Sequence, residues 1–149
     1  MSPEALFLGV LGLTAGALAI DRMARRRRAA VLRTAARRWS MQYFADDRFL
    51  LAAHAAKMLP AMHTVDLRVF DVLCRPAPQG YCYVFTIEYT HGAAGAQRRV
   101  RRVAALAEPS PDQPQPALTL APPNLPLLRQ YEFLAAGAME GRTASDGPA

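Results

Sequence analysis

The stretch "YCYVFTIEYT", residues 81–90, decides the fold class, because it consists almost entirely of residue types that favour extended chain. Successive side chains of a strand point to opposite faces, so the stretch separates into two sets. One face carries Tyr81, Tyr83, Phe85, Ile87 and Tyr89, and the other carries Cys82, Val84, Thr86, Glu88 and Thr90. This pattern predicts a strand whose aromatic face needs a covering layer.

Neighbouring stretches complete a sheet around this strand. "VDLRVFDVLCR" at residues 65–75 alternates with a change of phase near Val69 and Phe70, which predicts a β-bulge. "RRVRRVAALA" at residues 98–107 follows after a short connection, and "ALTLA" at residues 117–121 offers an edge strand. We therefore expect a small antiparallel sheet of three to four strands.

One or two helices are expected to pack on this sheet. A helix at residues 47–58, with Asp46 or Asp47 as its N-cap, would cover the aromatic face. A second short helix begins at residue 127 and has an apolar face that would dock on the domain, on a partner or on the membrane. The predicted fold class is therefore α+β, with one N-terminal transmembrane helix before the sheet.

The first hairpin of the sheet places both cysteines of the chain. If Arg75 pairs with Tyr81 around the loop "PAPQG", Cys74 faces Cys82 directly across the two strands. Thiols stay reduced in the cytoplasm, so we expect two packed thiols without a bridge. His91 lies nearby in the sequence, but the CxxC spacing of strong metal sites is absent.

The amino-terminal stretch "FLGVLGLTAGALAIDRMARRRR", residues 7–28, sets an apolar run directly before a group of arginines. Residues 5–20 carry no charge. As a helix they span about 24 Å, which is shorter than the ~30 Å hydrocarbon core of a bilayer. Long flanking side chains can make up the difference by reaching to the interface. We interpret this segment as a membrane anchor.

A cleaved export signal and a buried helix of a soluble core are the alternatives. An export signal carries positive charge before its apolar run, whereas only Glu4 stands there, although Ala17-Leu18-Ala19 resembles a cleavage site. A soluble amphipathic helix needs a polar face, and Thr14 is the single polar side chain of residues 5–20.

Charge is distributed unevenly along the chain and predicts its orientation. Residues 21–38 hold eight arginines and one aspartate, whereas residues 39–149 balance ten Lys and Arg against ten Asp and Glu. The positive-inside rule places the following domain in the cytoplasm and the amino terminus outside. The residues that set this topology, or bind anionic lipid head groups such as cardiolipin, are Arg22, Arg25, Arg26, Arg27 and Arg28. A neutral domain makes nucleic acid an unlikely partner.

Three glycines lie on one side of the predicted anchor. Gly9, Gly12 and Gly16 match the small-residue spacing that lets membrane helices approach closely. We expect them to be the contact face if the anchor helix binds a protein partner or forms a homodimer.

The predicted organisation has five parts: a transmembrane anchor (1–22), a basic juxtamembrane helix (23–39), a small cytoplasmic α+β domain (40–107), a proline-rich linker (108–126), and a short helix with a disordered tail (127–149). The juxtamembrane helix has a narrow apolar stripe that should dock on the domain. This stripe consists of Val31, Leu32, Ala35, Ala36 and Trp39.

No catalytic, cofactor or metal constellation is recognisable in the sequence. The three histidines, His54, His63 and His91, are scattered without ligand spacing, and phosphate-binding glycine loops and nucleophile elbows are absent. We therefore expect a protein that is not an enzyme and needs no cofactor.

Three stretches resemble a loose group of bacterial membrane-anchored proteins of unknown function. They are "LRTAARRWSMQYFADDRFLL", "YVFTIEYTHGAAGAQRRVRRVAALAEP" and "PALTLAPPN", a little more than half of the chain. The resemblance implies an anchor, a helix ending near a tryptophan and a small domain, but it brings no known site residues. Related proteins continue beyond the proline segment, whereas this chain stops soon after it. We expect a single-pass inner-membrane protein whose cytoplasmic module binds or scaffolds a partner; the alternative is an exported or peripheral domain that binds a ligand or nucleic acid.

Overall fold

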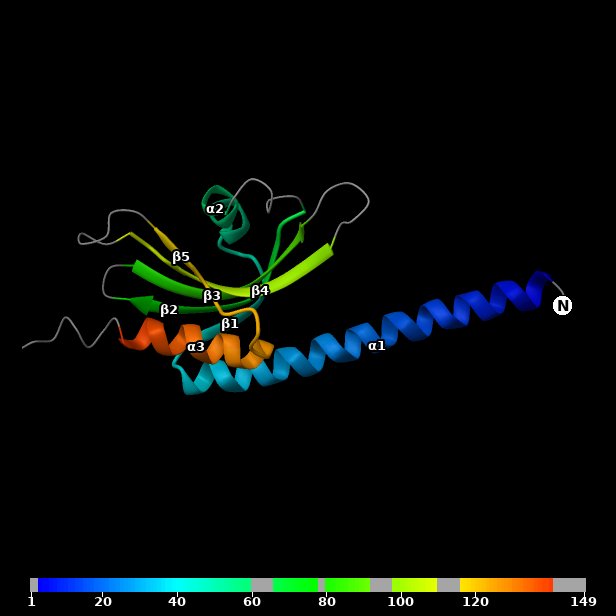
Figure 1. Cartoon of the computed structure of the whole chain (residues 1–149). Coiled ribbons are helices and arrows are strands. Elements are labelled where there is room, and N and C mark those ends of the chain that lie inside the picture. Colours follow the sequence, from blue (N-terminus) through cyan, green and yellow to red (C-terminus); the bar gives the residue numbers. More distant parts are fainter. Residues whose placement is uncertain (1–2, 60–65, 78–79, 92–97, 110–115, 141–149) are drawn as a thin grey trace, which may run out of the picture.

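The computed structural model describes residues 3–59, 66–77, 80–91, 98–109 and 116–140, and its fold is α+β (Figure 1). The elements in chain order are α1 (Pro3–Arg38), β1 (Gln42–Asp46), α2 (Leu51–Met58), β2 (Arg68–Ala77), β3 (Gly80–His91), β4 (Arg98–Ala107), β5 (Ala117–Leu120) and α3 (Leu127–Glu140). The expected tail at 141–149 lies outside the described residues, as does part of the proline-rich stretch, residues 110–115.

The sheet is an open antiparallel meander in the order β1-β2-β3-β4-β5. It therefore has five strands, and the expectation of three to four was too low. The additional strand is β1, whose five residues pair with β2 through Tyr43 and Leu73. The expected edge strand "ALTLA" is confirmed as β5, which pairs with the end of β4.

The expected bulge is confirmed in β2, where the pairing with β3 shifts between Phe70 and Leu73. Asp71 lies inside the bulge with a left-handed backbone conformation, φ 53°. A non-glycine residue rarely adopts this region, and aspartate tolerates it better than most. The bulge therefore fixes a carboxylate at a bend in the middle of the sheet.

The register of the first hairpin differs by one residue from the expectation. Arg75 pairs with Cys82, and Cys74 pairs with Tyr83, because only residues 78 and 79 separate the pair Ala77 and Gly80. A shift of one residue moves a side chain to the other face of a strand. The prediction that Cys74 faces Cys82 directly was wrong, although both thiols are buried and unbridged as expected.

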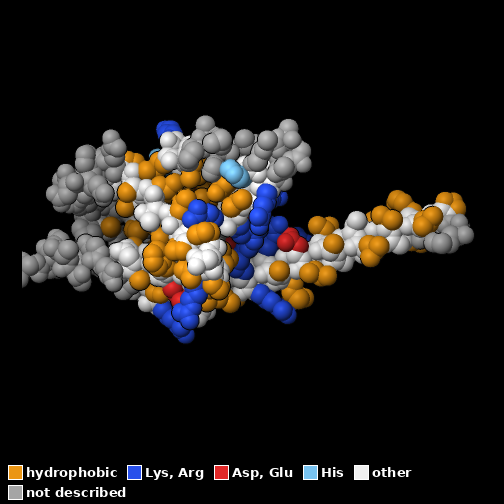
Figure 2. All heavy atoms as spheres, in the orientation of Figure 1, with side chains coloured by type: hydrophobic (Ala, Val, Ile, Leu, Met, Phe, Trp, Pro, Cys, Tyr) orange, Lys and Arg blue, Asp and Glu red, His pale blue; other side chains and the backbone are white. Residues whose placement is uncertain are grey.

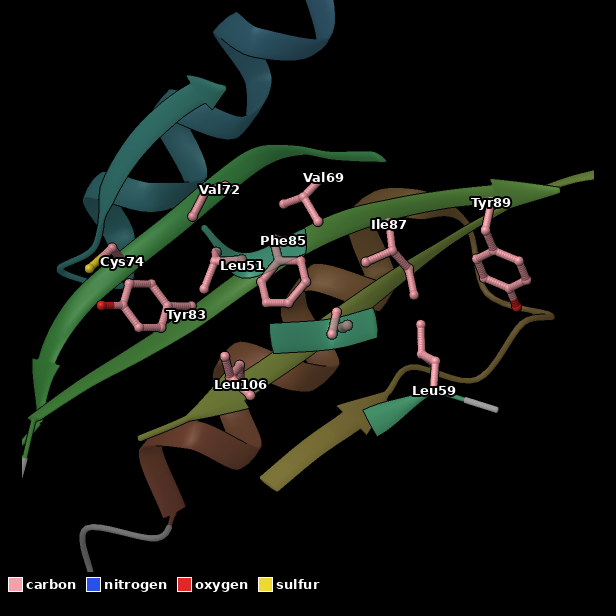
Figure 3. Packing of buried hydrophobic residues seen from close by; sticks show 12 residues of the cluster. Leu51, Leu59, Val69, Val72, Cys74, Tyr83, Phe85, Ile87, Tyr89 and Leu106 are labelled. Carbon is pink, nitrogen blue, oxygen red and sulfur yellow. The ribbon is translucent and has the colours of Figure 1, made fainter. Parts of the chain in front are cut away.

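The aromatic face of β3 is buried under α2, as predicted (Figures 1 and 3). Tyr83, Phe85, Ile87 and Tyr89 all belong to this core cluster, to which α2 contributes Leu51. Tyr81, the fifth residue of the predicted face, is 48% exposed. The expected helix at 47–58 begins later, at Leu51, because Leu50 adopts a left-handed conformation with φ 57°.

Asp47 nevertheless caps α2 from four residues before its first helical residue. Its carboxylate accepts hydrogen bonds from the backbone N–H groups of Phe49, Leu51 and Ala52 at 2.9–3.2 Å. These donors have no partner inside the helix, so the expected capping role of this aspartate is confirmed.

The opposite face of the sheet is covered by α3 and by the second half of α1 (Figure 1). Leu32 and Ala36 of α1 and Tyr131 and Leu134 of α3 are at most 4% exposed. The predicted apolar stripe is thus confirmed at Leu32 and Ala36, whereas Val31 stays exposed. All three helices therefore contact the sheet. The second half of α1 belongs to the domain core, whereas its first half projects from the domain.

Candidate functional site at the base of helix α1

The first half of α1 projects from the domain as an isolated apolar helix (Figures 1 and 2). Its exposed large side chains are Leu6, Phe7, Leu8, Val10, Leu11, Leu13, Leu18 and Ile20. The helix is long and apolar enough to span a membrane, and its most apolar 18-residue window, with mean hydropathy 1.5, is 0% buried. A core helix of this domain would be buried, whereas a membrane anchor or a signal sequence would not.

Thr14, the one polar side chain of this segment, is satisfied inside the helix. Its hydroxyl lies 3.0 Å from the carbonyl oxygen of Val10 and 2.9 Å from that of Leu11, and it donates to them. A hydroxyl bonded to its own helix needs no water, so it is compatible with a lipid environment.

The five predicted arginines do not share one environment. Arg22, Arg26 and Arg27 are exposed, and Arg25 is held by Asp21 at 2.8 Å in an exposed i,i+4 pair. Arg28 differs from the other four, because its side chain turns toward the sheet and is only 24% exposed. The structure therefore separates an exposed arginine collar, which we define as Arg22, Arg25, Arg26 and Arg27, from one arginine that contacts the domain.

Arg28 forms an ion pair with Asp71, the carboxylate at the bulge of β2. The Nε atom lies 2.7 Å from Oδ2, and the Asp71 side chain is only 7% exposed. The N–H of this contact does not align as a hydrogen bond. The attraction is therefore chiefly between charges, and it joins α1 to the middle of the sheet.

Two tyrosines complete the surroundings of Asp71. Tyr43 of β1 donates its hydroxyl proton to Oδ1 at 2.6 Å, and Tyr131 of α3 donates to the Asp71 carbonyl oxygen at 2.6 Å. Because Tyr131 has only one proton, Thr86 of β3 donates to the Tyr131 oxygen at 2.8 Å. We name Arg28, Tyr43, Asp71, Thr86 and Tyr131 the Asp71 cluster; it joins α1, α3 and three strands.

Electrostatics keep both tyrosines of this cluster protonated. Burial is the main cause that raises the pKa of Tyr43, and the hydrogen bond to Asp71 adds to it. Burial likewise raises the pKa of Tyr131, which is 0% exposed. The hydroxyl groups therefore act as hydrogen-bond donors over the whole physiological pH range, as a structural clamp requires.

A row of charges continues from Arg28 along the sheet. The Phe70 ring contacts both Arg28 and Arg101, whose guanidinium carbons lie 5.2 and 5.3 Å from its centre. Arg101 binds Glu88 at 2.7 Å. Arg99 also binds Glu88, at 3.1 Å, so this carboxylate holds the start of β4.

Asp66 extends this row to the start of β2. It contacts Arg99 at 3.0 Å and Arg68 at 3.3 Å. The hydrogen bond from Arg99 is the largest cause that lowers the pKa of Asp66, followed by the charge of Arg68. The carboxylate thus stays ionised between two arginines whose side chains are more than half exposed.

The predicted glycine face is unobstructed by the domain. No atom lies within 4 Å of the position that a Cβ would take at Gly9, Gly12 or Gly16. Gly12 and Leu32 are 20 residues apart, which in a helix of 3.6 residues per turn corresponds to about 200°. The glycines therefore point away from the side of α1 that packs on the sheet.

Asp71, Tyr43 and Tyr131 were missed by sequence reasoning. The available signal was a carboxylate between apolar neighbours in "VFDVLC", because such a group needs a partner when it is buried. Within the described part of the chain, no group of three His, Cys, Asp or Glu residues could hold a metal ion.

Comparisons with protein-family models, curated proteins and solved structures find no match to this chain. The resemblance to bacterial membrane-anchored proteins therefore stays a prediction. Any function must be inferred from the residues and geometry of α1 and the domain.

Proposed function

We propose that this chain is a single-pass protein of the bacterial inner membrane, in which α1 anchors a cytoplasmic α+β module that binds or scaffolds a partner. The observation that carries the proposal is the unburied apolar half of α1, followed at once by the exposed arginine collar. A segment with this pattern is stable in lipid and keeps its charged end at the interface.

The energetics of insertion favour lipid for this segment. Each large aliphatic or phenylalanine side chain at the centre of a membrane helix contributes about −0.3 to −0.6 kcal/mol, whereas an Arg or Asp costs about 2.5–3.5 kcal/mol. Eight large apolar side chains are exposed between Leu6 and Ile20, and no charge interrupts them. The first charges, Asp21 and Arg22, stand where the helix would leave the hydrocarbon.

The dimensions support a domain that lies directly at the membrane surface. Arg28 is eight residues beyond Ile20, which is about 12 Å along a helix. The head-group layer of one leaflet is roughly 5–8 Å thick. The part of the domain that is attached at Arg28 would therefore begin just outside the head groups. Arg22 and Arg25 would lie within them, and Arg26 and Arg27, about 9 and 10 Å beyond Ile20, at their outer boundary.

A shallow groove between α1 and α3 supports a binding role for the module. It is lined by apolar side chains that include Val31, Trp39 and Leu128, with Arg38 and Glu132 also in its lining. Apolar surface with polar groups around it is typical of protein contact sites. This groove is the surface at which we expect a partner to bind.

Membrane fractionation tests the anchor. We expect the full chain to stay in the membrane pellet through a high-salt wash, to need detergent for release, and to keep its first residues in an intact-mass measurement. Leu13→Arg should lower membrane retention strongly, whereas Val31→Arg, a matched change outside the span, should not. Release by salt, or a mature chain that begins near residue 20, would contradict the proposal in favour of a peripheral or exported protein.

A reporter fusion tests the orientation independently. A phosphatase that is active only outside the cytoplasm should be inactive when it is fused to the carboxyl terminus of the chain. High phosphatase activity in an intact, membrane-retained fusion would place the module outside and contradict the proposed topology.

A further inference from the structure

We propose that the edge of the domain that faces the membrane is a second contact site for anionic lipid head groups, formed by Arg68, Arg98 and Arg99. We name these three residues the strand-end arginines. The inference rests on the proposed membrane anchoring. It adds a surface of the folded sheet to the collar arginines, which lie on the anchor helix alone.

The topology brings the strand-end arginines to the side from which α1 projects. β2 begins at Arg68 and β4 begins at Arg98. Figure 1 shows the start of β4 and the end of β3 directed toward the projecting half of α1. The Phe70 ring, which contacts both Arg28 and Arg101, fixes β4 next to α1 at this level.

Simple lengths show that the strand ends reach the head groups. Arg98 is three residues before Arg101, which is about 10 Å along a strand. Ile20, where the apolar span ends, is about 12 Å along the helix from Arg28. Arg28 and Arg101 contact the same ring, so they lie at a similar distance from the membrane. Measured from that level, the start of β4 is about 10 Å closer to the membrane and the end of the span about 12 Å closer. The start of β4 therefore extends nearly as far as the end of the span.

The charge of this edge fits an anionic surface. Four arginines, Arg68, Arg98, Arg99 and Arg101, stand against the two carboxylates of Asp66 and Glu88, so the edge has a net charge of +2. Arg98 is exposed and has no carboxylate partner among the described residues. Figure 2 shows arginine side chains gathered where α1 leaves the domain.

The ion pairs also hold these guanidinium groups in place. Arg68 and Arg99 remain 63% and 55% exposed although both contact Asp66. A phosphate can therefore bind them without first ordering two long side chains, which lowers the entropic cost of the contact.

Lipid is a better occupant for this surface than nucleic acid. Stacking of bases needs exposed aromatic rings beside the arginines, whereas Tyr83, Phe85 and Tyr89 of β3 are buried in the core. Tyr81 is 48% exposed, but it lies at the start of β3, at the opposite end of the strand from Arg98 and Arg99. Lipid phosphates are instead present at this depth as soon as α1 inserts. A span of about 24 Å is shorter than the hydrocarbon core, so the helix does not need to tilt to fit the bilayer. The flanking arginines are therefore expected to set its tilt and rotation.

Paramagnetic broadening in nanodiscs tests the contact with the full chain. The methyl groups of Val100, Val103 and Leu106 form a series along β4, and a gadolinium chelate on a lipid head group broadens the methyls nearest to the membrane. We expect broadening to decrease from Val100 to Leu106. At Val100 it should increase when phosphatidylglycerol replaces about one third of the phosphatidylcholine.

Removal of charge tests whether this edge, and not another part of the protein, makes the lipid contact. Arg68→Gln with Arg98→Gln should abolish the increase caused by phosphatidylglycerol, since each arginine near an anionic surface changes the ratio of docked to undocked molecules about fivefold. Arg37→Gln with Arg38→Gln removes the same charge from the end of α1 that is remote from the span, and it should leave the increase unchanged.

The possible outcomes distinguish this inference from the proposed function. If broadening at Val100 does not depend on phosphatidylglycerol, or the Arg68 and Arg98 variant behaves like the parent, the second lipid site is refuted. A spin label on the lipid tails should still broaden Leu13, because that result depends only on the anchor. If Leu13 is unaffected, the membrane anchor itself is refuted. If the same variant instead loses tight binding of a short RNA without a change in lipid dependence, the surface belongs to nucleic acid and the inference fails.

Discussion

Asp71→Asn is the sharpest perturbation of the joint between α1 and the sheet. Asparagine keeps the shape of the side chain, tolerates the left-handed backbone at φ 53°, and retains an oxygen that can accept from Tyr43. It removes only the negative charge that faces Arg28. Removal of one partner from a fully buried ion pair costs about 3–5 kcal/mol. Because Arg28 is 24% exposed, water recovers part of this loss, and we expect a cost of about 2 kcal/mol.

Urea unfolding of the full chain in mild detergent measures this cost. Trp39 is the single tryptophan and packs against the core cluster beneath α1 and α3, so its fluorescence reports on this face of the sheet. With a slope of about 1–3 kcal/mol per molar urea for a small protein, the midpoint should fall by about 0.7–2 M. Arg25→Gln is the matched control. Its pair with Asp21 is exposed on both sides, so the change should be below about 0.5 kcal/mol.

A double-mutant cycle with Arg28→Met tests whether the two charges act on each other. We expect a coupling free energy of about 1 kcal/mol or more, because the side chains are in direct contact. If Asp71→Asn unfolds at the same urea concentration as Arg25→Gln, or if the two changes are additive, the ion pair does not hold α1 on the sheet and the reasoning is refuted.

Three further changes test other parts of the domain. Burial raises the pKa of the Cys74 thiol from 9.0 to about 11 and also raises that of Cys82. Alkylation of Cys74 at pH 8 should therefore be about 100-fold slower in the native chain than in urea, and alkylation of Cys82 should also be slower. Stability from Cys74 should be lost as the pH rises from about 9 to 11. Equal alkylation rates in the native and unfolded chain would contradict this. Gln130→Met leaves the Val103 N–H without its acceptor at 3.0 Å, so urea unfolding should show a loss of about 1–3 kcal/mol; no loss would mean that water satisfies the group. Asp47→Ala removes the cap of α2 and should cost about 1 kcal/mol in the same assay, and faster hydrogen exchange of the first-turn amides should locate the effect.

Local patterns of the sequence predicted much of the sheet. The alternation in residues 81–90 is a property of the extended backbone itself, so it correctly divided the side chains of β3 between two faces. The bulge in β2 and the apolar contacts of Leu32 and Ala36 followed from the same kind of periodicity. In each case the signal lies within a few neighbouring residues.

Non-local pairing explains what the sequence could not provide. The five residues of β1 form a strand because β2 is beside them, and no alternation within "QYFAD" indicates such a partner. The hairpin register depends on the backbone at Gly80, whose φ of 142° is available to glycine and allows the pairing with Ala77. A side chain there would collide with Glu108, whose carboxylate accepts from the Tyr81 N–H and the Tyr83 hydroxyl.

The base of α1 depends both on a local sequence pattern and on a contact between distant residues. Composition identified Arg28 as one of five equivalent arginines near a membrane, and four of them are exposed. Its role in the fold depends on Asp71, which is 43 residues later in the chain and is buried by a bulge that only the folded sheet creates. Charge patterning predicts a membrane boundary, but it cannot tell which of the five arginines contacts the domain and which stay exposed.

The apolar segment and the docked segment of α1 form one continuous helix, which favours a fixed platform over a flexibly tethered domain under the proposed anchoring. One helix runs from Pro3 to Arg38, and its last third is fixed to the sheet by Leu32, Ala36 and the pair of Arg28 with Asp71. No loop separates the apolar half of α1 from the domain, so under the proposed membrane anchoring the groove between α1 and α3 would stand at a set height above the bilayer. Val31 and Trp39 are 11 and 19 residues beyond Ile20, or about 16 and 28 Å along the helix axis. Under the proposed anchoring, a partner bound in this groove would therefore be held within about 30 Å of the hydrocarbon, whatever its own length or flexibility.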